Sequence, residues 1–249
     1  MDFQLQDTVV LVTGASRGLG AAMAVTLAEE GATVVAAARS KDSLDDVAAR
    51  GQGRISVEVV DMRDETAVSG LVDSVVARHG RIDALVNNAG IAAAGTFAEQ
   101  DPQVWKDTMT VNVIAPMLLA QAAGRKMIEQ GHGRIVNIAS TTGVRGKPHL
   151  VGYSASKGAV VRMTEALAAE WAAKNVQVNC IAPGAFATDA QKAVLESPDL
   201  LQRRVAKIPA RRMADAAELM PLVCLLVSAS SPFTTGAVFV VDGGESGKL

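Results

Sequence analysis

The chain has 249 residues, of which 49% are hydrophobic and 20% are charged, a balance that excludes an intrinsically disordered protein. Its formal net charge of −2 gives no basic footprint for nucleic acid, and no apolar run reaches the ~18 residues that span a bilayer. Cys180 and Cys224 stand alone in apolar segments, which predicts buried thiols in a cytoplasmic protein without a metal site.

Strand-like and helix-like segments alternate along the chain. Short apolar runs predict buried strands at residues 8–12, 33–38, 55–60, 83–86, 134–139, 176–181 and 237–241. Helical patterns predict a first helix that follows a glycine-rich turn and runs to about residue 30, and further helices at residues 42–50, 64–78, 101–130, 152–174 and 214–227. The stretch 185–212 is less regular, and we expect it to form a mobile lid over a substrate.

The strands are continuously apolar rather than alternating, which is typical of a parallel sheet that helices cover on both faces. We therefore predict an α/β fold with a doubly wound parallel sheet of about seven strands, in a single domain that spans residues 1–249. Such sheets bind ligands at the carboxyl ends of their strands. The glycine-rich and polar segments that follow the strands fall at this edge: residues 14–20, residues 88–90, Ser140 and Pro183-Gly184.

The first strand leads into a glycine-rich turn that opens a helix. Glycines in such a turn let the backbone approach a pyrophosphate at the N-terminus of the helix. An ordinary turn can carry the same glycines, but the strand before it and the helix after it favour dinucleotide binding. The predicted contacts in this turn are Gly14, Ser16, Arg17, Gly18, Leu19 and Gly20.

The end of the second strand indicates which nicotinamide cofactor binds. NAD-binding chains place a carboxylate there for the ribose hydroxyls, whereas this chain has Arg39 and Ser40. Arg39 and Arg17 could hold a 2′-phosphate, although either arginine alone could be a solvated surface charge. We predict NADP(H) as the preferred cofactor, with NAD(H) as the alternative. The predicted cofactor contacts also include Asp61 and Met62. Asp61 would bind the adenine amino group or cap the next turn.

The only tyrosine of the chain, Tyr153, stands four residues before Lys157 in a predicted helix, so both side chains share one face. The unperturbed pKa of a phenol is ~10, and a nearby ammonium favours the phenolate, so we expect Lys157 to lower the pKa of Tyr153. Ser140, at the end of a strand, supplies a second hydrogen-bond donor. A tyrosine–lysine pair alone is more often a surface contact, but the three side chains together predict interconversion of a carbonyl and an alcohol.

In order and spacing, these motifs resemble the short-chain dehydrogenase/reductase family over essentially the whole chain, and most closely its 3-oxoacyl-carrier-protein reductase-like members. The residues that carry the resemblance are the turn from Thr13 to Gly20, Asn87-Asn88-Ala89-Gly90, Asn112, Ser140, Tyr153 with Lys157, Pro183-Gly184, Thr188 and the ending Val241-Asp242-Gly243-Gly244. The resemblance implies a Rossmann-type fold, an NADP-dependent oxidoreductase that acts on CH–OH groups, and a small-molecule carbonyl or alcohol substrate. It also implies a homo-oligomer, and we expect a tetramer.

The resemblance implies a role for each matching residue. Tyr153 would be the acid/base, Lys157 would lower its pKa and bind the nicotinamide ribose, and Ser140 would hold the substrate oxygen. Asn112 would help to position a water that links Lys157 to solvent, while Asn87 would brace the central strands. Further cofactor contacts are expected from Asn88, Ala89, Gly90, Pro183, Gly184, Phe186 and Thr188, besides Tyr153 and Lys157.

The sequence alone does not identify the substrate. Arg145, Lys147 and His149 precede the tyrosine helix and would favour an anionic ketone, although a solvated basic loop is the more common explanation. Carrier-protein-acting members place basic residues beside the entrance, whereas this chain has Gly131 at one such position and Lys174 at the other. We predict a ketone or 3-oxoacyl reductase. The alternatives are an NAD-linked sugar, polyol or hydroxy-acid dehydrogenase and, outside the enzymes, a cofactor-sensing protein with a degenerate site.

The Arg39→Asp variant tests the predicted phosphate clamp. A carboxylate at this position repels a 2′-phosphate and accepts hydrogen bonds from ribose hydroxyls, so we expect NADPH binding to weaken more than NADH binding. Titration of both proteins with each cofactor measures the preference. An unchanged preference in the variant would count against the clamp.

Overall fold

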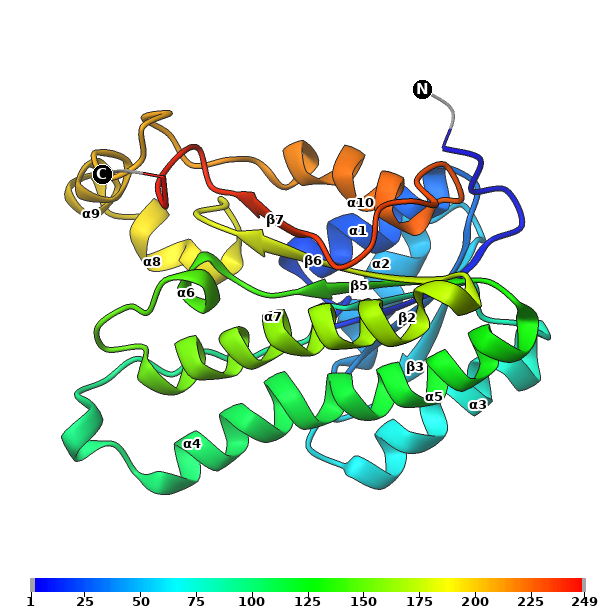
Figure 1. The fold of residues 1–249 in the computed structure, drawn as a ribbon. Helices are drawn as coiled ribbons and strands as arrows, with labels where there is room; N and C mark the ends of the chain where they lie inside the picture. Colours follow the sequence, from blue (N-terminus) through cyan, green and yellow to red (C-terminus); the bar gives the residue numbers. More distant parts are fainter. Residues whose placement is uncertain (1–2, 248–249) are drawn as a thin grey trace.

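The computed structural model describes residues 3–247, so residues 1–2 and 248–249 of the predicted domain lie outside the described part. Its strands form one seven-stranded parallel sheet in the order β3-β2-β1-β4-β5-β6-β7 (Figure 1). The strands are β1 (Val9–Thr13), β2 (Thr33–Ala38), β3 (Ile55–Val59), β4 (Ala84–Asn87), β5 (Gly133–Ile138), β6 (Val176–Pro183) and β7 (Val238–Val241). Each predicted strand is present, with its ends displaced by two residues or fewer.

Helices cover both faces of the sheet, as predicted. The α-helices are α1 (Gly18–Glu29), α2 (Lys41–Arg50), α3 (Glu65–His79), α4 (Pro102–Met109), α5 (Ala115–Gln130), α6 (Thr141–Val144), α7 (Val151–Trp171), α8 (Lys192–Leu195), α9 (Pro198–Val205) and α10 (Met220–Val227). Helices α1 and α10 pack on one face, and α5 and α7 pack on the other (Figure 1). Within residues 3–247, no helix is long and apolar enough to cross a membrane.

Local signals in the sequence set the ends of several helices. The Asp64 carboxylate accepts hydrogen bonds from the amides of Thr66 and Ala67, both at 3.0 Å, and so caps α3. Asp101 caps α4 in the same way, with Pro102 at the first helical position. Strand β1, which lies between β2 and β4, is buried along its whole length. Full burial of one of its valine or leucine side chains contributes about 1.5–3 kcal/mol, and β4, β5 and β6 are buried along their whole length as well.

The predicted helix at residues 101–130 is interrupted. Helices α4 and α5 are joined by a π-helical turn, Thr110–Ile114, in which the Ala115 amide bonds to the Thr110 carbonyl. Pro116 has no amide hydrogen, so the regular bond to the carbonyl of Asn112 cannot form. π-turns inside helices are frequent at functional sites, and this one carries Asn112.

The stretch 185–212 is more regular than its sequence indicated. It contains α8 and α9, which are too short to show a helical period, and the 3₁₀ turn Asp189–Gln191. These elements enclose a small core of their own around Ile208 and Met213. Arg204 of α9 makes two hydrogen bonds of 2.7 Å to the Glu245 carboxylate, so the C-terminal segment anchors this stretch.

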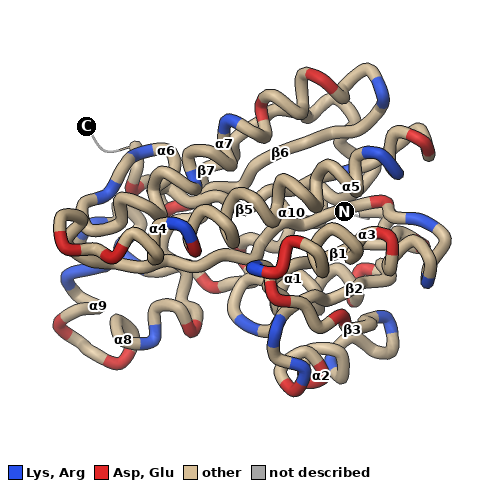
Figure 2. Tube along the Cα trace, turned by 90° about the horizontal axis from the view of Figure 1, so that it is seen from below, with Lys and Arg blue, Asp and Glu red and all other residues tan. Residues whose placement is uncertain are grey.

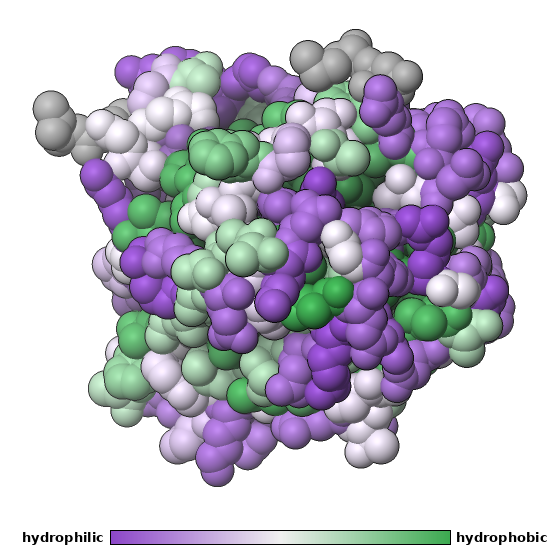
Figure 3. All heavy atoms as spheres, turned by 45° about the vertical axis from the view of Figure 1, so that its right-hand side comes forward, coloured by the Kyte–Doolittle hydropathy of each residue, from purple (hydrophilic) through white to green (hydrophobic). Residues whose placement is uncertain are grey.

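The surface mixes charges and polarities. In Figure 2, the positions of lysine and arginine (blue) and of aspartate and glutamate (red) are interspersed along the Cα trace. On the face drawn in Figure 3, hydrophobic residues likewise stand among hydrophilic ones.

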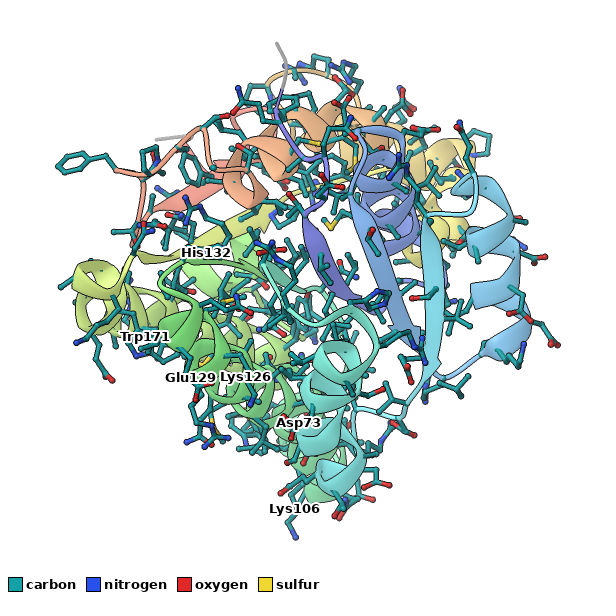
Figure 4. The ribbon with its side chains drawn as sticks, turned by 90° about the vertical axis from the view of Figure 1, so that its right-hand side faces the viewer. Asp73, Lys106, Lys126, Glu129, His132 and Trp171 are labelled. Atoms are coloured by element: carbon teal, nitrogen blue, oxygen red, sulfur yellow. The ribbon has the colours of Figure 1, made fainter. Side chains whose placement is uncertain are left out.

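The Trp171 ring, at the end of α7, occupies the space beside Gly124 of α5 (Figure 4). A Cβ at Gly124 would lie 2.5 Å from the ring, so Gly124→Ala is expected to lower the free energy of unfolding by about 1–3 kcal/mol. A Cβ added at Gly70 in α3 would have no atom within 4 Å. Gly70→Ala is therefore expected to raise the free energy of unfolding by about 0.5–1 kcal/mol. Unfolding in denaturant measures both variants, and changes of the same sign would contradict this packing.

Candidate active site

A cavity of about 540 Å³ opens at the carboxyl edge of the sheet, beside β1, β2 and β4. Most of the cofactor contacts predicted from the sequence line its wall. They are Gly14, Ser16, Arg17, Gly18, Leu19, Gly20, Arg39, Ser40, Asp61, Met62, Asn88, Ala89, Gly90 and Thr188. Parallel strands place their carboxyl ends at one edge, which explains why segments so distant in sequence meet here.

The glycine-rich turn fits closely against the loop after β4. Gly14 has a φ of +65°, and a Cβ there would lie 2.8 Å from the Ala89 Cα. A Cβ on Gly20 would overlap the Gly14 carbonyl oxygen. The Asn88 side-chain amide donates to the carbonyls of Thr13 and Gly14, at 2.9 and 3.2 Å, and fixes the turn. The backbone therefore lies open to the cavity at the start of α1, as a bound pyrophosphate requires.

The other end of the cavity carries positive charge. Arg17 and Arg39 both line it and are exposed, and within residues 3–247 neither forms a salt bridge. Asp61 lines the cavity and also accepts a hydrogen bond from the Arg63 amide at 3.0 Å, so it does cap the following turn. These residues suit a dinucleotide with an additional phosphate.

Sequence reasoning missed eight residues of the cavity wall, namely Ala38, Ser43, Val60, Arg63, Ile91, Val111, Asp189 and Ala190. Ser43 stands one helical turn after Ser40, a spacing that could have indicated it. Val111 had no such signal, because the π-turn that contains it cannot be read from the pattern of apolar residues.

Lys157 lies buried beside the tyrosine. Its side chain is 4% exposed, its Nζ donates to the Ile138 carbonyl at 2.7 Å, and the distance from Nζ to the centre of the Tyr153 ring is 5.9 Å. Burial disfavours the ammonium and lowers the pKa of Lys157 to about 8. The helical spacing therefore places the two side chains together, as predicted.

The pKa of Tyr153 differs from the expectation. Burial raises it above the ordinary value of 10.0, and a hydrogen bond with Ser140 opposes the rise. Removal of water from around the phenolate is thus the largest influence on this pKa, and it outweighs the hydrogen bond with Ser140. In the chain by itself, Tyr153 is a neutral hydrogen-bond donor at physiological pH.

Ser140 begins helix α6 at the end of β5. Its Oγ accepts a hydrogen bond from the Thr142 amide at 3.2 Å, which orients the side chain, and it shares a hydrogen bond with the Tyr153 phenol. Two hydroxyl groups therefore converge at the carboxyl edge of the sheet. Such a pair can bind one oxygen atom and stabilise negative charge on it.

Asn112 connects the π-turn to the catalytic pair. It is 1% exposed, and its side-chain amide accepts from the Ile91 amide at 2.8 Å and donates to the Ile91 carbonyl at 2.9 Å. A Cβ on Gly90 would lie 3.3 Å from both Asn112 Oδ1 and Lys157 Nζ, so the cavity meets the catalytic pair at Gly90.

Asn87 braces the central strands, as expected. Its side-chain amide donates to Asn137 Oδ1 on β5 at 2.9 Å and to the Pro116 carbonyl on α5 at 3.3 Å.

Five predicted cofactor contacts are not part of the cavity wall: Tyr153, Lys157, Pro183, Gly184 and Phe186. Phe186 is 4% exposed, and a Cβ on Gly184 would lie 2.5 Å from the Asp242 Cβ. The cofactor contacts of these five residues stay predictions.

The short chain dehydrogenase family model matches residues 8–199. This chain belongs to that family. It is 38% identical over 245 residues to 2-dehydro-3-deoxy-D-gluconate 5-dehydrogenase of Dickeya dadantii, covering 97% of this chain and 96% of the relative. It is 34% identical over 244 residues to 3-oxoacyl-[acyl-carrier-protein] reductase of Thermotoga maritima, covering 97% of this chain and 98% of that reductase.

A solved structure is similar over the same length. Gluconate 5-dehydrogenase from Burkholderia cenocepacia, in complex with NADP and tartrate, has a TM-score of 0.94 and 34% identity, covering 100% of this chain and 98% of that one. The family, the doubly wound parallel sheet and the role of an oxidoreductase predicted from the sequence are thereby confirmed.

The buried ammonium makes stability depend on pH. In the unfolded chain Lys157 keeps its proton up to its ordinary pKa of 10.5, whereas in the folded protein it loses the proton above about 8. The folded chain binds fewer protons between these values, so its stability gains a contribution that grows to about 3 kcal/mol as pH rises. Lys157→Met lacks this contribution.

Denaturant unfolding of the cofactor-free proteins at a series of pH values measures the effect. The free energy of unfolding of the wild type, minus that of Lys157→Met, is expected to increase from about pH 8 to pH 10.5. A difference that does not change with pH would contradict a buried ammonium.

Proposed function

We propose that this chain transfers a hydride between NADP(H) and a small carbonyl or alcohol substrate. The observation that carries the proposal is that Tyr153, Ser140 and Lys157 come together beside Gly90, which lines the cavity. Arg17 and Arg39 favour the phosphorylated cofactor over NAD(H), and the similar gluconate 5-dehydrogenase was solved with NADP.

The bound cofactor would supply or accept the hydride. For reduction, the raised pKa keeps Tyr153 protonated, so its phenol donates a hydrogen bond and then a proton to the substrate oxygen. Ser140 donates a second hydrogen bond to that oxygen. Lys157, with a pKa of about 8, lies beside the phenol and can return a proton to it near neutral pH. Asn112 would position the route by which Lys157 regains its proton from solvent.

We favour a substrate that carries a carboxylate, such as a keto or hydroxy acid derived from a sugar. Arg145, Lys147 and His149 are exposed on the loop before α7. Two hydrogen bonds tie this loop to its surroundings, from the Gly95 amide to the His149 carbonyl at 2.9 Å and from the Lys147 amide to Ser154 Oγ on α7 at 3.3 Å. The loop lies between Ser140 and Tyr153 in the chain, so we propose that it borders the substrate. The relative that acts on 2-dehydro-3-deoxy-D-gluconate supports this class.

A 3-oxoacyl thioester is the second candidate substrate, and the reductase of Thermotoga maritima supports it. Gly131 stands where carrier-protein-acting relatives are expected to have a basic residue, so the carboxylate class remains our first choice.

We also propose that residues 1–249 act as one domain in a cytoplasmic homotetramer. All seven strands of the described chain belong to one sheet, which supports a single domain. Both cysteines are free and buried, as is usual in a reducing compartment. Met117 and Ile128 on α5 and Val151 on α7 are 37%, 36% and 40% exposed, and contact between subunits would cover them.

A screen of NADPH oxidation over sugar-derived keto acids, neutral ketones and 3-oxoacyl thioesters tests this function. We expect turnover of the keto acids, and Tyr153→Phe is expected to lower it by at least on the order of 100- to 1000-fold while NADPH binding stays nearly intact. Binding is measured by fluorescence titration of NADPH.

Two results would contradict the proposal. Full activity of Tyr153→Phe would exclude the phenol as the acid. An absence of turnover with every substrate class, in a wild-type protein that binds NADPH, would favour the alternative of a cofactor-sensing protein.

A further inference from the structure

Ser156 joins two elements of the active site. It lies on α7 between Tyr153 and Lys157 and is 0% exposed. Its hydroxyl donates to the Tyr153 carbonyl at 2.8 Å and accepts from the Asn112 side-chain amide at 3.0 Å. A serine inside a helix commonly bonds back to a carbonyl of the preceding turn or points to solvent. Ser156 makes the backward bond and, in addition, receives a bond from the π-turn.

Asn112 also bonds to the loop that follows β4. Both backbone polar groups of Ile91 bond to the Asn112 side chain, at 2.8 and 2.9 Å. Ile91 directly follows Gly90, and a Cβ on Gly90 would lie only 3.3 Å from Lys157 Nζ. A small rotation of the Asn112 amide would therefore move the backbone that borders the ammonium.

We propose that Ser156 is a positioning residue for the hydride-transfer site. Its hydroxyl fixes the orientation of Asn112, and Asn112 then holds the backbone of Gly90 and Ile91 beside Lys157. The expected effect on turnover rests on the proposed function, whereas the hydrogen bond between Asn112 and Ser156 does not depend on it. The effect is a matter of alignment, to which catalysis is sensitive, because a displacement of ~1 Å in a reacting group can lower the rate on the order of 100-fold.

The Ser156→Ala variant removes the hydroxyl, and Thr164→Val is its matched control. Thr164 lies two turns further along α7, is also 0% exposed, donates to the Val160 carbonyl at 2.8 Å and accepts from the Asn137 amide at 2.9 Å. Both variants lose one buried hydroxyl that donates to a carbonyl of the preceding turn and accepts from an asparagine amide, and Thr164 also bonds to the Cys180 thiol, so we expect a fall in Tm at least as large in the control. Only Ser156→Ala is expected to lower kcat, on the order of 10- to 100-fold, while the KM for NADPH changes little.

A second measurement does not depend on turnover. Hydrogen exchange of the Ile91 amide in the cofactor-free protein reports how firmly Asn112 is held. We expect exchange to become on the order of 10-fold faster in Ser156→Ala and to stay unchanged in Thr164→Val. Ser156→Cys, which keeps the size but offers a weaker hydrogen-bonding group, is expected to give an intermediate rate and an intermediate kcat.

A double variant tests whether Ser156 acts through Asn112. In an Asn112→Ala background, Ser156→Ala should cause no further loss of kcat, because the residue it positions is gone. Losses that multiply, or an Ile91 amide that exchanges at the wild-type rate in Ser156→Ala, would overturn the proposal. Faster exchange at Ile91 in Ser156→Ala but not in Thr164→Val would support the positioning role of Ser156, even if no screened substrate is turned over. A lack of turnover would contradict only the proposed function.

Discussion

The structure depends on one buried ammonium. Lys157 is 4% exposed and bonds to the carbonyl at the end of β5, so the charge stands at the edge where the parallel strands end. Desolvation makes this arrangement unfavourable for an isolated lysine and brings its pKa to about 8, within reach of physiological pH. The arrangement is useful because a group with such a pKa exchanges protons readily at neutral pH. The π-turn, the loop after β4 and helix α7 all pack around it.

The same burial separates the roles of the two groups. It raises the pKa of Tyr153 and lowers that of Lys157, so the phenol stays protonated while the ammonium can give up its proton. Neighbouring groups whose pKa values shift in opposite directions are typical of acid/base sites. Reduction of a carbonyl suits this state of the free chain. Oxidation of an alcohol begins from the phenolate and would therefore become faster as pH rises.

Much of this could be predicted from the sequence, because the signals are local. Continuous apolar runs located the strands, and the spacing of Tyr153 and Lys157 placed them on one helical face. The bond between Asn112 and Ser156 joins residues 44 positions apart and depends on how the π-turn packs on α7. The π-turn was hidden as well, since a proline in a helix can cause a kink, a 3₁₀ turn or a π-turn. The sign of the Tyr153 shift was wrong because spacing reveals a nearby charge but not the loss of water.

The central claim, that burial keeps the phenol protonated, can be tested directly because Tyr153 is the only tyrosine of the chain. A pH titration of the near-ultraviolet phenolate absorbance of the cofactor-free protein follows this one group, and Tyr153→Phe provides the blank. The account predicts a midpoint above the ordinary pKa of 10.0. A midpoint below that value would show that the ammonium outweighs burial, and it would contradict the account.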